Sequence, residues 1–414
     1  MTASHSLRSI FACWPLLGAC VTQTPLGHDA ALPNREAATP ASHDAGASAN
    51  DAAGMQSRAL DAGGPPLDAA DSASDPDQSA TDGGITPGLA CTIGVDSLLV
   101  AGVERAGYPP YAANDCALLY VASDGALWLR EPGALSERVI ADATERPARP
   151  SLAGPPNDPA RLMAWESLRD QVVRVRFEGT TRSVLGNYHH SGQPRATSDA
   201  IALTAWSAAD PHSDADILLY EPVSQGLTTI SMDPGQQLFA DVSPTQVVYS
   251  DFAEDPDQRF DDDGQDLANL VLVDRATHAR QTLELTGKQA FPLFSDAGRI
   301  VYLSWALGHP EPKLSAYAIM SWDATSGARA LLAQIETQPP YVRPSVYGST
   351  VEWVERPFGA DERLMRVQLQ AAEPRVAFAM PGVHLYATAS SRSATWLAAS
   401  SATQSAPVLM AIPR

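Results

Sequence analysis

The sequence predicts an all-β protein: a β-propeller of about seven four-stranded blades, or alternatively six, preceded by a disordered linker. Past Cys91, short apolar runs alternate with Gly, Pro and Asp turns, and no segment has a long helical period. A strand ending in an aromatic residue recurs there every 41–53 residues, the length of one blade. The segment before Cys91 has a different composition, without aromatic residues from Val21 to Leu89.

The first residues have the layout of a secretory signal: Arg8, an apolar run over 10–17, then small residues ending at Cys20. The motif Leu17-Gly18-Ala19-Cys20 resembles the lipobox of bacterial lipoproteins. This resemblance implies a signal peptide over 1–19 and a lipid-modified Cys20. In such lipoproteins an aspartate directly after the cysteine is linked to retention in the inner membrane, and here that position is Val21. The resemblance therefore also implies an outer-membrane lipoprotein that faces the periplasm or the cell surface. The alternative is an ordinary signal with an incidental cysteine.

Residues 20–89 are predicted to be a disordered tether that begins at the lipidated cysteine. Their composition is dominated by Ala, Asp, Ser, Gly and Pro. Such a segment cannot bury enough apolar surface to offset the conformational entropy that ordering would cost. We therefore expect a linker that holds the domain at 90–414 away from a membrane, and the alternative is a binding tail.

The repeat in 90–414 consists of paired apolar strands. The first strand of each pair ends at an aromatic residue or one residue after it: Leu118–Val121, Leu162–Trp165, Leu203–Trp206, Val247–Tyr249, Ile300–Tyr302, Val351–Trp353 and Ala394–Trp396. The second strand follows at Ala126–Arg130, Val172–Phe177, Asp216–Tyr220, Asn269–Val273, Tyr317–Trp322, Leu364–Leu369 and Val408–Ile412. Five units show a third run, at Arg182–Leu185, Leu227–Ile230, Arg280–Leu283, Ala330–Leu332 and Arg375–Phe378.

Prolines and an unassigned strand suggest how the units begin and how the ring closes. Five units start at a proline, which we expect in the loop that leads into each unit: Pro109, Pro150, Pro194, Pro292 and Pro344. The last unit lacks a final strand. The run Ser97–Val103 is predicted to pair with it and close the ring, while six blades plus an extra sheet is the alternative.

The repeat resembles the TolB-like propellers of exported bacterial proteins. The matching residues are the run Pro344–Trp353, the strand Asp216–Tyr220, and the turns Leu272–Thr277 and Trp322–Gly327. The resemblance covers about 95–414 and implies a propeller. TolB carries a separate α/β domain before its propeller, and this chain has the tether instead, so TolB's envelope role is not transferred.

The net charge limits the possible binding partners, and the cysteines suggest a disulfide. The formal net charge of −20 argues against nucleic acid, and we expect a self-repelling monomer. Two of the four cysteines, Cys91 and Cys116, lie in the body of an exported chain, which favours a disulfide between them. The alternative is a pair of buried free thiols.

The loop Glu254–Asp266 is a candidate calcium site. Its closely spaced carboxylates, of which Asp257, Asp261, Asp263 and Asp266 are the proposed ligands, suit a hard cation that takes six to eight oxygen ligands. The spacing does not fit an EF-hand, because Arg259 occupies the first ligand position relative to Gly264. A solvated acidic loop is the alternative, and no other cofactor is expected.

Catalytic motifs are missing from the sequence, which has neither G-x-S-x-G nor H-E-x-x-H. The adjacent His189 and His190 would point apart in an extended strand. The tryptophans Trp165, Trp206, Trp305 and Trp353 suit packing between blades. We therefore expect a non-enzymatic binding or scaffolding lipoprotein. The alternatives are a propeller enzyme acting on an envelope or extracellular glycan and a calcium-dependent adhesin or sensor.

Overall fold

The computed structural model describes twelve segments of the chain, all from residue 109 onward: 109–114, 117–131, 138–155, 158–210, 212–260, 267–305, 315–337, 343–357, 359–371, 373–392, 394–401 and 407–414. The predicted signal peptide, the tether, Cys20, Cys91, Cys116 and the strand Ser97–Val103 lie outside these segments, and their predictions stay open.

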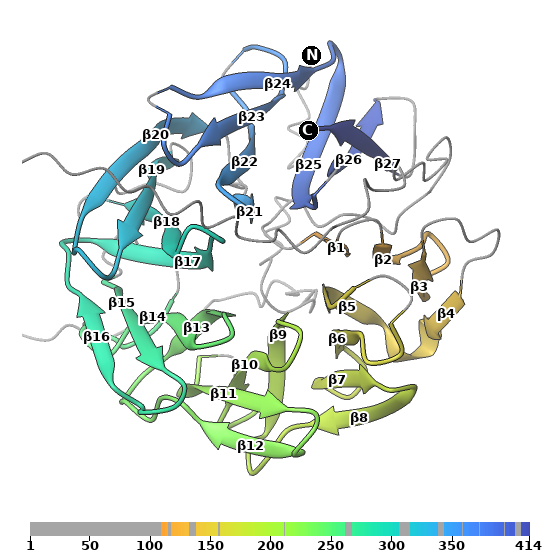
Figure 1. Cartoon of the computed structure of the whole chain (residues 1–414), viewed down its shortest axis with the longest axis vertical. Coiled ribbons are helices and arrows are strands. Elements are labelled where there is room, and N and C mark those ends of the chain that lie inside the picture. Colours follow the sequence, from red (N-terminus) through yellow and green to blue (C-terminus); the bar gives the residue numbers. More distant parts are fainter. Residues whose placement is uncertain are drawn as a thin grey trace, which may run out of the picture. The chain divides into compact units, whose positions relative to one another are not determined.

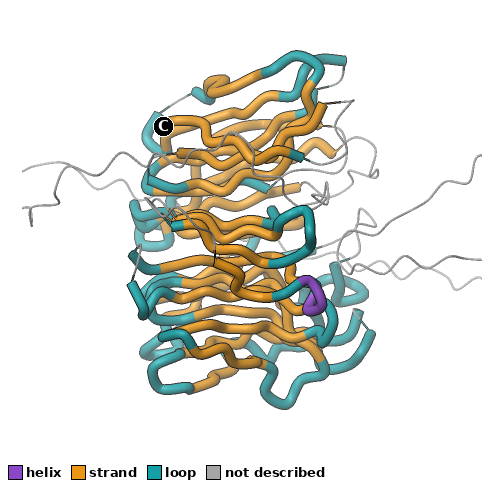
Figure 2. Tube along the Cα trace, turned by 90° about the vertical axis from the view of Figure 1, so that its right-hand side faces the viewer, coloured by secondary structure: helices purple, strands orange, loops and turns teal. Residues whose placement is uncertain are grey.

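Seven antiparallel sheets surround a central axis, each with its strands in sequence order from the axis outward (Figures 1 and 2). Blade 1 contains β1 (Tyr111–Asn114), β2 (Ala117–Val121), β3 (Leu127–Arg130) and β4 (Arg138–Ala141), followed by a short 3-10 helix, η1 (Ala143–Glu145). Blade 2 contains β5 (Pro147–Ala153), β6 (Leu162–Ser167), β7 (Val172–Phe177) and β8 (Thr180–Val184). Blade 3 contains β9 (His190–Ala196), β10 (Ile201–Trp206), β11 (Ala215–Glu221) and β12 (Gly226–Thr229).

The remaining blades repeat this order. Blade 4 contains β13 (Gln237–Val242), β14 (Gln246–Asp251), β15 (Asn269–Asp274) and β16 (Arg280–Leu283), and blade 5 contains β17 (Lys288–Phe294), β18 (Arg299–Trp305), β19 (Ser315–Asp323) and β20 (Arg329–Thr337). Blade 6 contains β21 (Ser345–Tyr347), β22 (Thr350–Glu355), β23 (Arg363–Gln368) and β24 (Arg375–Ala379). Blade 7 has three strands within the described residues: β25 (Val383–Ser390), β26 (Ala394–Ser401) and β27 (Val408–Pro413).

The predicted all-β propeller is therefore confirmed, with seven blades rather than six. The two strands predicted in each unit are the second and third strands of a blade. Second strands such as β6 and β10 are buried along their whole length because neighbouring blades cover both faces of the sheet. Fourth strands such as β8 and β16 are largely exposed and carry polar side chains.

The innermost strand of each blade contradicts one prediction. Pro109 and Pro344 precede β1 and β21 as expected, but Pro150, Pro194 and Pro292 lie inside β5, β9 and β17. The prediction is wrong for these three prolines because each innermost strand is the edge strand of its sheet and pairs with a neighbour on one side only. A proline whose missing N–H would face the unpaired edge removes no hydrogen bond between strands.

The same three strands are bulged at their prolines. Their register against the second strand shifts at these positions. The residue before each proline has a left-handed backbone, with φ of 48° at Arg149, 54° at Gln193 and 58° at Phe291. A bulge re-aims the side chain next to it.

Apolar side chains fill the space between blades. Trp165 packs with Leu119 and Leu127 of blade 1, and Trp353 joins the cluster that includes Trp305 of blade 5. All four tryptophans singled out in the sequence are buried, at 8% exposure or less. Their predicted role in packing between blades is confirmed.

Hydrogen bonds near the axis connect every blade to the next. Side chains provide six of the seven links: Asn114 Nδ2 to Gly154 O (2.5 Å), Ala196 N to Ser151 Oγ (3.0 Å), Phe239 N to Gln193 Oε1 (3.3 Å), Phe294 N to Asp241 Oδ2 (2.7 Å), Ser345 Oγ with Ser390 Oγ (2.6 Å), and Ala398 N to Tyr111 Oη (3.0 Å). Blades 5 and 6 are linked through the backbone, from Asp296 N to Gly348 O at 3.2 Å. These links hold the innermost strands in place around the channel.

Candidate functional site: the central channel

A cavity of about 200 Å³ lies on the axis, and all seven innermost strands line it. Each of these strands contributes at least one residue to the lining, among them Ala112, Ser151, Arg195, Asp241, Leu293, Ser345 and Thr388. Cavities of this kind, with a few convergent polar groups, are the usual place for a ligand.

Three arginines and one aspartate provide the charge of the wall. Arg149 forms an ion pair with Glu166 of its own blade at 2.7 Å. Burial raises the pKa of Asp241, and the charge of Arg195 together with backbone amide hydrogen bonds opposes that shift. Desolvation therefore disfavours the ionised form of Asp241, and the charge of Arg195 offsets part of that effect.

Arg343 lines both the central cavity and a second, smaller cavity. Its guanidinium carbon is 3.6 Å from the ring centroid of Phe291 and 4.9 Å from that of Phe239. Both phenylalanines occupy bulge positions with positive φ, at 58° and 60°. A second cavity beside these rings measures about 10 Å³, room for about one water molecule. The second cavity is therefore too small for an organic ligand.

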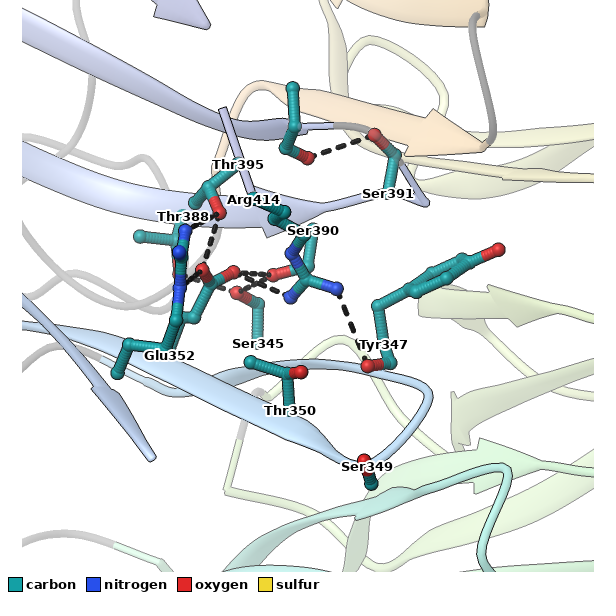
Figure 3. Close-up of polar contacts among 12 residues, drawn as sticks. Ser345, Tyr347, Ser349, Thr350, Glu352, Thr388, Ser390, Ser391, Thr395 and Arg414 are labelled. Carbon is teal, nitrogen blue, oxygen red and sulfur yellow. Dashed lines mark hydrogen bonds and ion pairs between the residues drawn. The ribbon is translucent and has the colours of Figure 1, made fainter. Parts of the chain in front are cut away.

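A buried polar network leads from the cavity wall into the contact between blades 6 and 7 (Figure 3). Its centre is Glu352 of β22, which is fully buried. The carboxylate accepts hydrogen bonds from Arg366 Nε, Arg414 and Ser390 Oγ, each at 2.6 Å, and from Thr395 Oγ1 at 2.5 Å. Burial by itself would raise the pKa of Glu352, but Arg414, Ser390 and Thr395 outweigh it and lower the pKa below its usual value.

The hydroxyl groups of this network have a defined proton direction. Ser390 gives its only proton to Glu352, which is ionised and can only accept. Ser345, 2.6 Å from Ser390, must therefore donate to it, and Thr388, 2.7 Å from Ser345, must donate to Ser345. The chain of donors runs from Thr388 through Ser345 and Ser390 to Glu352.

The predicted calcium loop is described only in part. Asp261, Asp263 and Asp266 lie outside the described residues. Asp257 accepts a hydrogen bond from Arg259 N at 3.2 Å, and its other oxygen is 3.7 Å from Arg259 Nε. Within the described segments, no cluster of three or more His, Cys, Asp or Glu residues could hold a metal ion. The calcium site stays a prediction.

The two adjacent histidines do not point apart: their rings meet edge to face with centroids 5.9 Å apart, because His189 lies in the bend before β9 and not in the strand. His189 is exposed, whereas His190 is buried and stacks on Trp206 with ring centroids 4.7 Å apart. His190 begins β9, away from the lining residues Pro194 and Arg195 at the other end of that strand.

Among the described residues, no helix has the length and apolar character needed to cross a membrane.

Sequence reasoning missed the cavity residues because it did not recognise the innermost strands. Arg149, Arg195 and Asp241 lie in short polar stretches that carry little strand signal. The recurring x-Pro pair, as in Arg149-Pro150 and Phe291-Pro292, was the available signal. It marks the bulge of the innermost strand rather than a loop.

Comparisons with known proteins agree with this architecture. No protein-family model and no curated protein matches the chain. Among solved structures, the chain is similar to the β-propeller domain of the Trilobed protease from Pyrococcus furiosus, described as having an open velcro topology. The TM-score is 0.51 at 9% identity, over 75% of this chain and 94% of that one.

Two TolB structures are also similar. TolB from Acinetobacter baumannii has a TM-score of 0.40 and 15% identity over 64% of this chain, and this chain spans 64% of its length. A putative TolB from Agrobacterium tumefaciens has a TM-score of 0.42 and 13% identity, over 59% of this chain and 85% of that one. At 9% identity the similarity to the protease domain shows the propeller fold alone, and the specific function has to be inferred from the site.

Proposed function

We propose that this protein is a cell-envelope lipoprotein whose propeller is a non-enzymatic binding or scaffolding module that receives its ligand in the central channel. The observation that carries the proposal is the polar cavity of about 200 Å³ lined by all seven blades. Links between successive blades surround it, so the wall is preorganised for binding. Among the described residues that line it, Asp241 is the one carboxylate, whereas glycoside hydrolysis uses a pair of carboxylates.

The anchor in this proposal is lipid on Cys20, followed by the tether at 20–89. Several acyl chains would give a stable attachment to the outer membrane, and the tether would let the module reach a partner. The proposed partner is a protein or glycan of the envelope, bound by a monomeric propeller.

The anchor is tested by metabolic labelling with a palmitate analogue and by detergent-phase partitioning. The wild type and a Cys13→Ser control should be labelled and enter the detergent phase. Cys20→Ser should do neither. Labelling of the Cys20→Ser variant would show that the lipobox assignment is wrong.

Binding in the channel is tested with a photo-cross-linking amino acid placed in the living cell. At Leu293, in the cavity wall, it should capture a specific envelope component that mass spectrometry can identify. At Val376, which is 50% exposed on the outer strand β24, it should not. Equal capture at both positions, or capture at neither, would contradict a channel-binding module.

A further inference from the structure

Bulges in the innermost strands decide which side chains line the cavity. In five blades the register between the innermost and second strands shifts once, and the first paired residue after the shift lines the cavity: Ser151, Arg195, Asp241, Leu293 and Thr388. A bulge re-aims the side chain next to it. Two of these positions carry a buried hydroxyl, Ser151 at 6% and Thr388 at 4% exposure. The bulges therefore bring hydroxyl groups from blades 2 and 7 to the same cavity.

On blades 6 and 7, three hydroxyl groups keep lone pairs for a ligand. Ser345, Thr388 and Ser390 all line the cavity. Their protons are directed along the chain that ends at Glu352, so each oxygen can only accept from a further group. Among the described residues, Ser345 is the hydrogen-bond partner of Thr388 Oγ1, which therefore keeps two acceptor positions. A ligand that satisfies this part of the wall must bring protons.

The hydroxyl of Ser151 has the opposite requirement. Its oxygen accepts from Ala196 N at 3.0 Å, and no described residue accepts its proton. It can therefore donate one hydrogen bond into the cavity that it lines. A carboxylate can only accept and an ammonium group can only donate, so neither alone complements both Ser151 and Thr388. A ligand with several hydroxyl groups complements both without any ionic group.

The spacing of the acceptors and the volume of the cavity indicate a ring with adjacent hydroxyl groups. Ser345 Oγ lies 2.7 Å from Thr388 Oγ1 and 2.6 Å from Ser390 Oγ, so three acceptors stand side by side. Neighbouring hydroxyl groups on a pyranose ring have a similar separation. A cavity of about 150 Å³ holds benzene, so one of about 200 Å³ has room for one six-membered ring with substituents. An arene is disfavoured, because the hydroxyl groups of the wall would lose their hydration without compensation.

We propose that the channel cavity binds one pyranose ring of a neutral sugar, with adjacent hydroxyl groups donating to Thr388 and Ser345 and a further hydroxyl accepting from Ser151. This inference rests on the proposed binding function and names the ligand class of the same site. The sugar is either free or a terminal unit of an envelope glycan, and both sources present the same chemistry.

The test is isothermal titration of the full chain in detergent with probes of similar ring size. Glucose, galactose and mannose present different arrangements of adjacent hydroxyl groups. The controls are cyclohexanol, which has one hydroxyl, cyclohexanecarboxylate, which can only accept, and cyclohexylammonium, which can only donate. At least one hexose should bind at least about tenfold more tightly than all three controls, because each control leaves a hydroxyl of the wall without a partner. Failure of every hexose to exceed the controls would overturn the proposal.

Variants of the two buried hydroxyls locate the site. Thr388→Val keeps the side-chain shape, removes the acceptor and should weaken binding of the preferred hexose by about tenfold. Thr388→Ser puts the hydroxyl back and should recover most of that affinity, which separates loss of the hydroxyl from loss of the fold. Ser151→Ala removes the donor and should also weaken binding. Thr181→Val, at an exposed position of β8, is the matched control and should change nothing. Unchanged hexose affinity in both Thr388→Val and Ser151→Ala would contradict this site.

Failure of this inference is distinguishable from failure of the proposed function. A partner cross-linked at Leu293 together with no preference for a hexose would refute the sugar ligand and keep the binding module. Hexose selectivity that depends on the Thr388 hydroxyl would support the ligand class whatever the cross-linking result. A glycan captured at Leu293 whose binding the preferred hexose competes away would identify the polymer-linked source.

Discussion

Glu352 shows how a single charged residue can organise the contact between two blades. It is fully buried, and it accepts from Arg366 of its own blade and from Ser390 and Thr395 of blade 7. Removing one partner of a buried, hydrogen-bonded charge cluster leaves the other charges uncompensated. Glu352→Gln is therefore expected to lower the free energy of unfolding by about 3 kcal/mol, measured by urea denaturation.

The control for this variant is Glu373→Gln, an exposed glutamate between β23 and β24. Its effect should stay within about 0.5 kcal/mol, as for ordinary surface substitutions. If Glu352→Gln costs no more than Glu373→Gln, the network in Figure 3 does not stabilise the fold.

The stabilisation from Glu352 should also depend on pH. Its pKa in the folded protein is lowered, so its contribution is present above the unfolded-state pKa of about 4.3 and is lost as pH falls through the lower folded-state pKa. The difference in unfolding free energy between the wild type and Glu352→Gln should therefore be constant from pH 7 to 5 and shrink towards pH 3. Urea titrations at four pH values would measure it, and a difference independent of pH would exclude this assignment.

Asp241 should behave with the opposite sign. Burial raises its pKa, so the folded protein holds this proton to higher pH than the unfolded chain does, and stability falls as pH rises from about 3.9 through the folded-state pKa. An asparagine can still accept from Phe294 N without the charge. Asp241→Asn should therefore be at least as stable as the wild type at pH 7, with a smaller advantage at pH 4. A less stable variant at pH 7 would show that the ionised aspartate stabilises the channel.

At the scale of strands, the sequence predicted the strands that are buried on both faces of their sheet. Runs such as Leu203–Trp206 are buried along their length, and this leaves a strong apolar signal. The innermost strands face the channel on one edge and carry Arg, Gln and Pro, as in β5 and β9. Their strand character comes from pairing with the second strand and from the bulge, neither of which is visible in local composition.

A glycine in β9 fixes the close approach between blades 2 and 3. A Cβ on Gly192 would lie 2.8 Å from Glu166 Oε2, the oxygen that pairs with Arg149 at 2.7 Å. Gly192→Ala should push Glu166 from this position and lower the free energy of unfolding by about 1–3 kcal/mol in urea denaturation. Adding Glu166→Ser, which makes room for the methyl group, should cost less in the Gly192→Ala background than alone. Purely additive costs would show that the two side chains do not compete for this space.

At the scale of the molecule, the number of blades could be predicted from the repeat, but the site could not. The hydrogen bond between Ser345 and Ser390 joins residues 45 positions apart, and Arg195 and Asp241 are brought together from different blades. Only closure of the ring makes these residues neighbours. The lipobox and the acidic loop are conspicuous because they are local in sequence, whereas the channel wall collects a few residues from every blade.

Closure of the ring can be tested at the contact between blades 7 and 1. Tyr111 of β1 is buried, and its hydroxyl accepts from Ala398 N of β26 at 3.0 Å, with Trp396 and Leu409 packed in the same cluster. Tyr111→Phe leaves the Ala398 amide without that acceptor, which should lower the free energy of unfolding by about 1–3 kcal/mol.

The matched control is Tyr302 of β18, equally buried, whose hydroxyl has no hydrogen-bond partner among the described residues. Tyr302→Phe removes an unsatisfied polar group and should be neutral or stabilising in the same urea denaturation. A larger loss for Tyr111→Phe than for Tyr302→Phe would show that one hydrogen bond at the closing contact stabilises the whole ring. Equal effects would mean that closure depends on apolar packing alone.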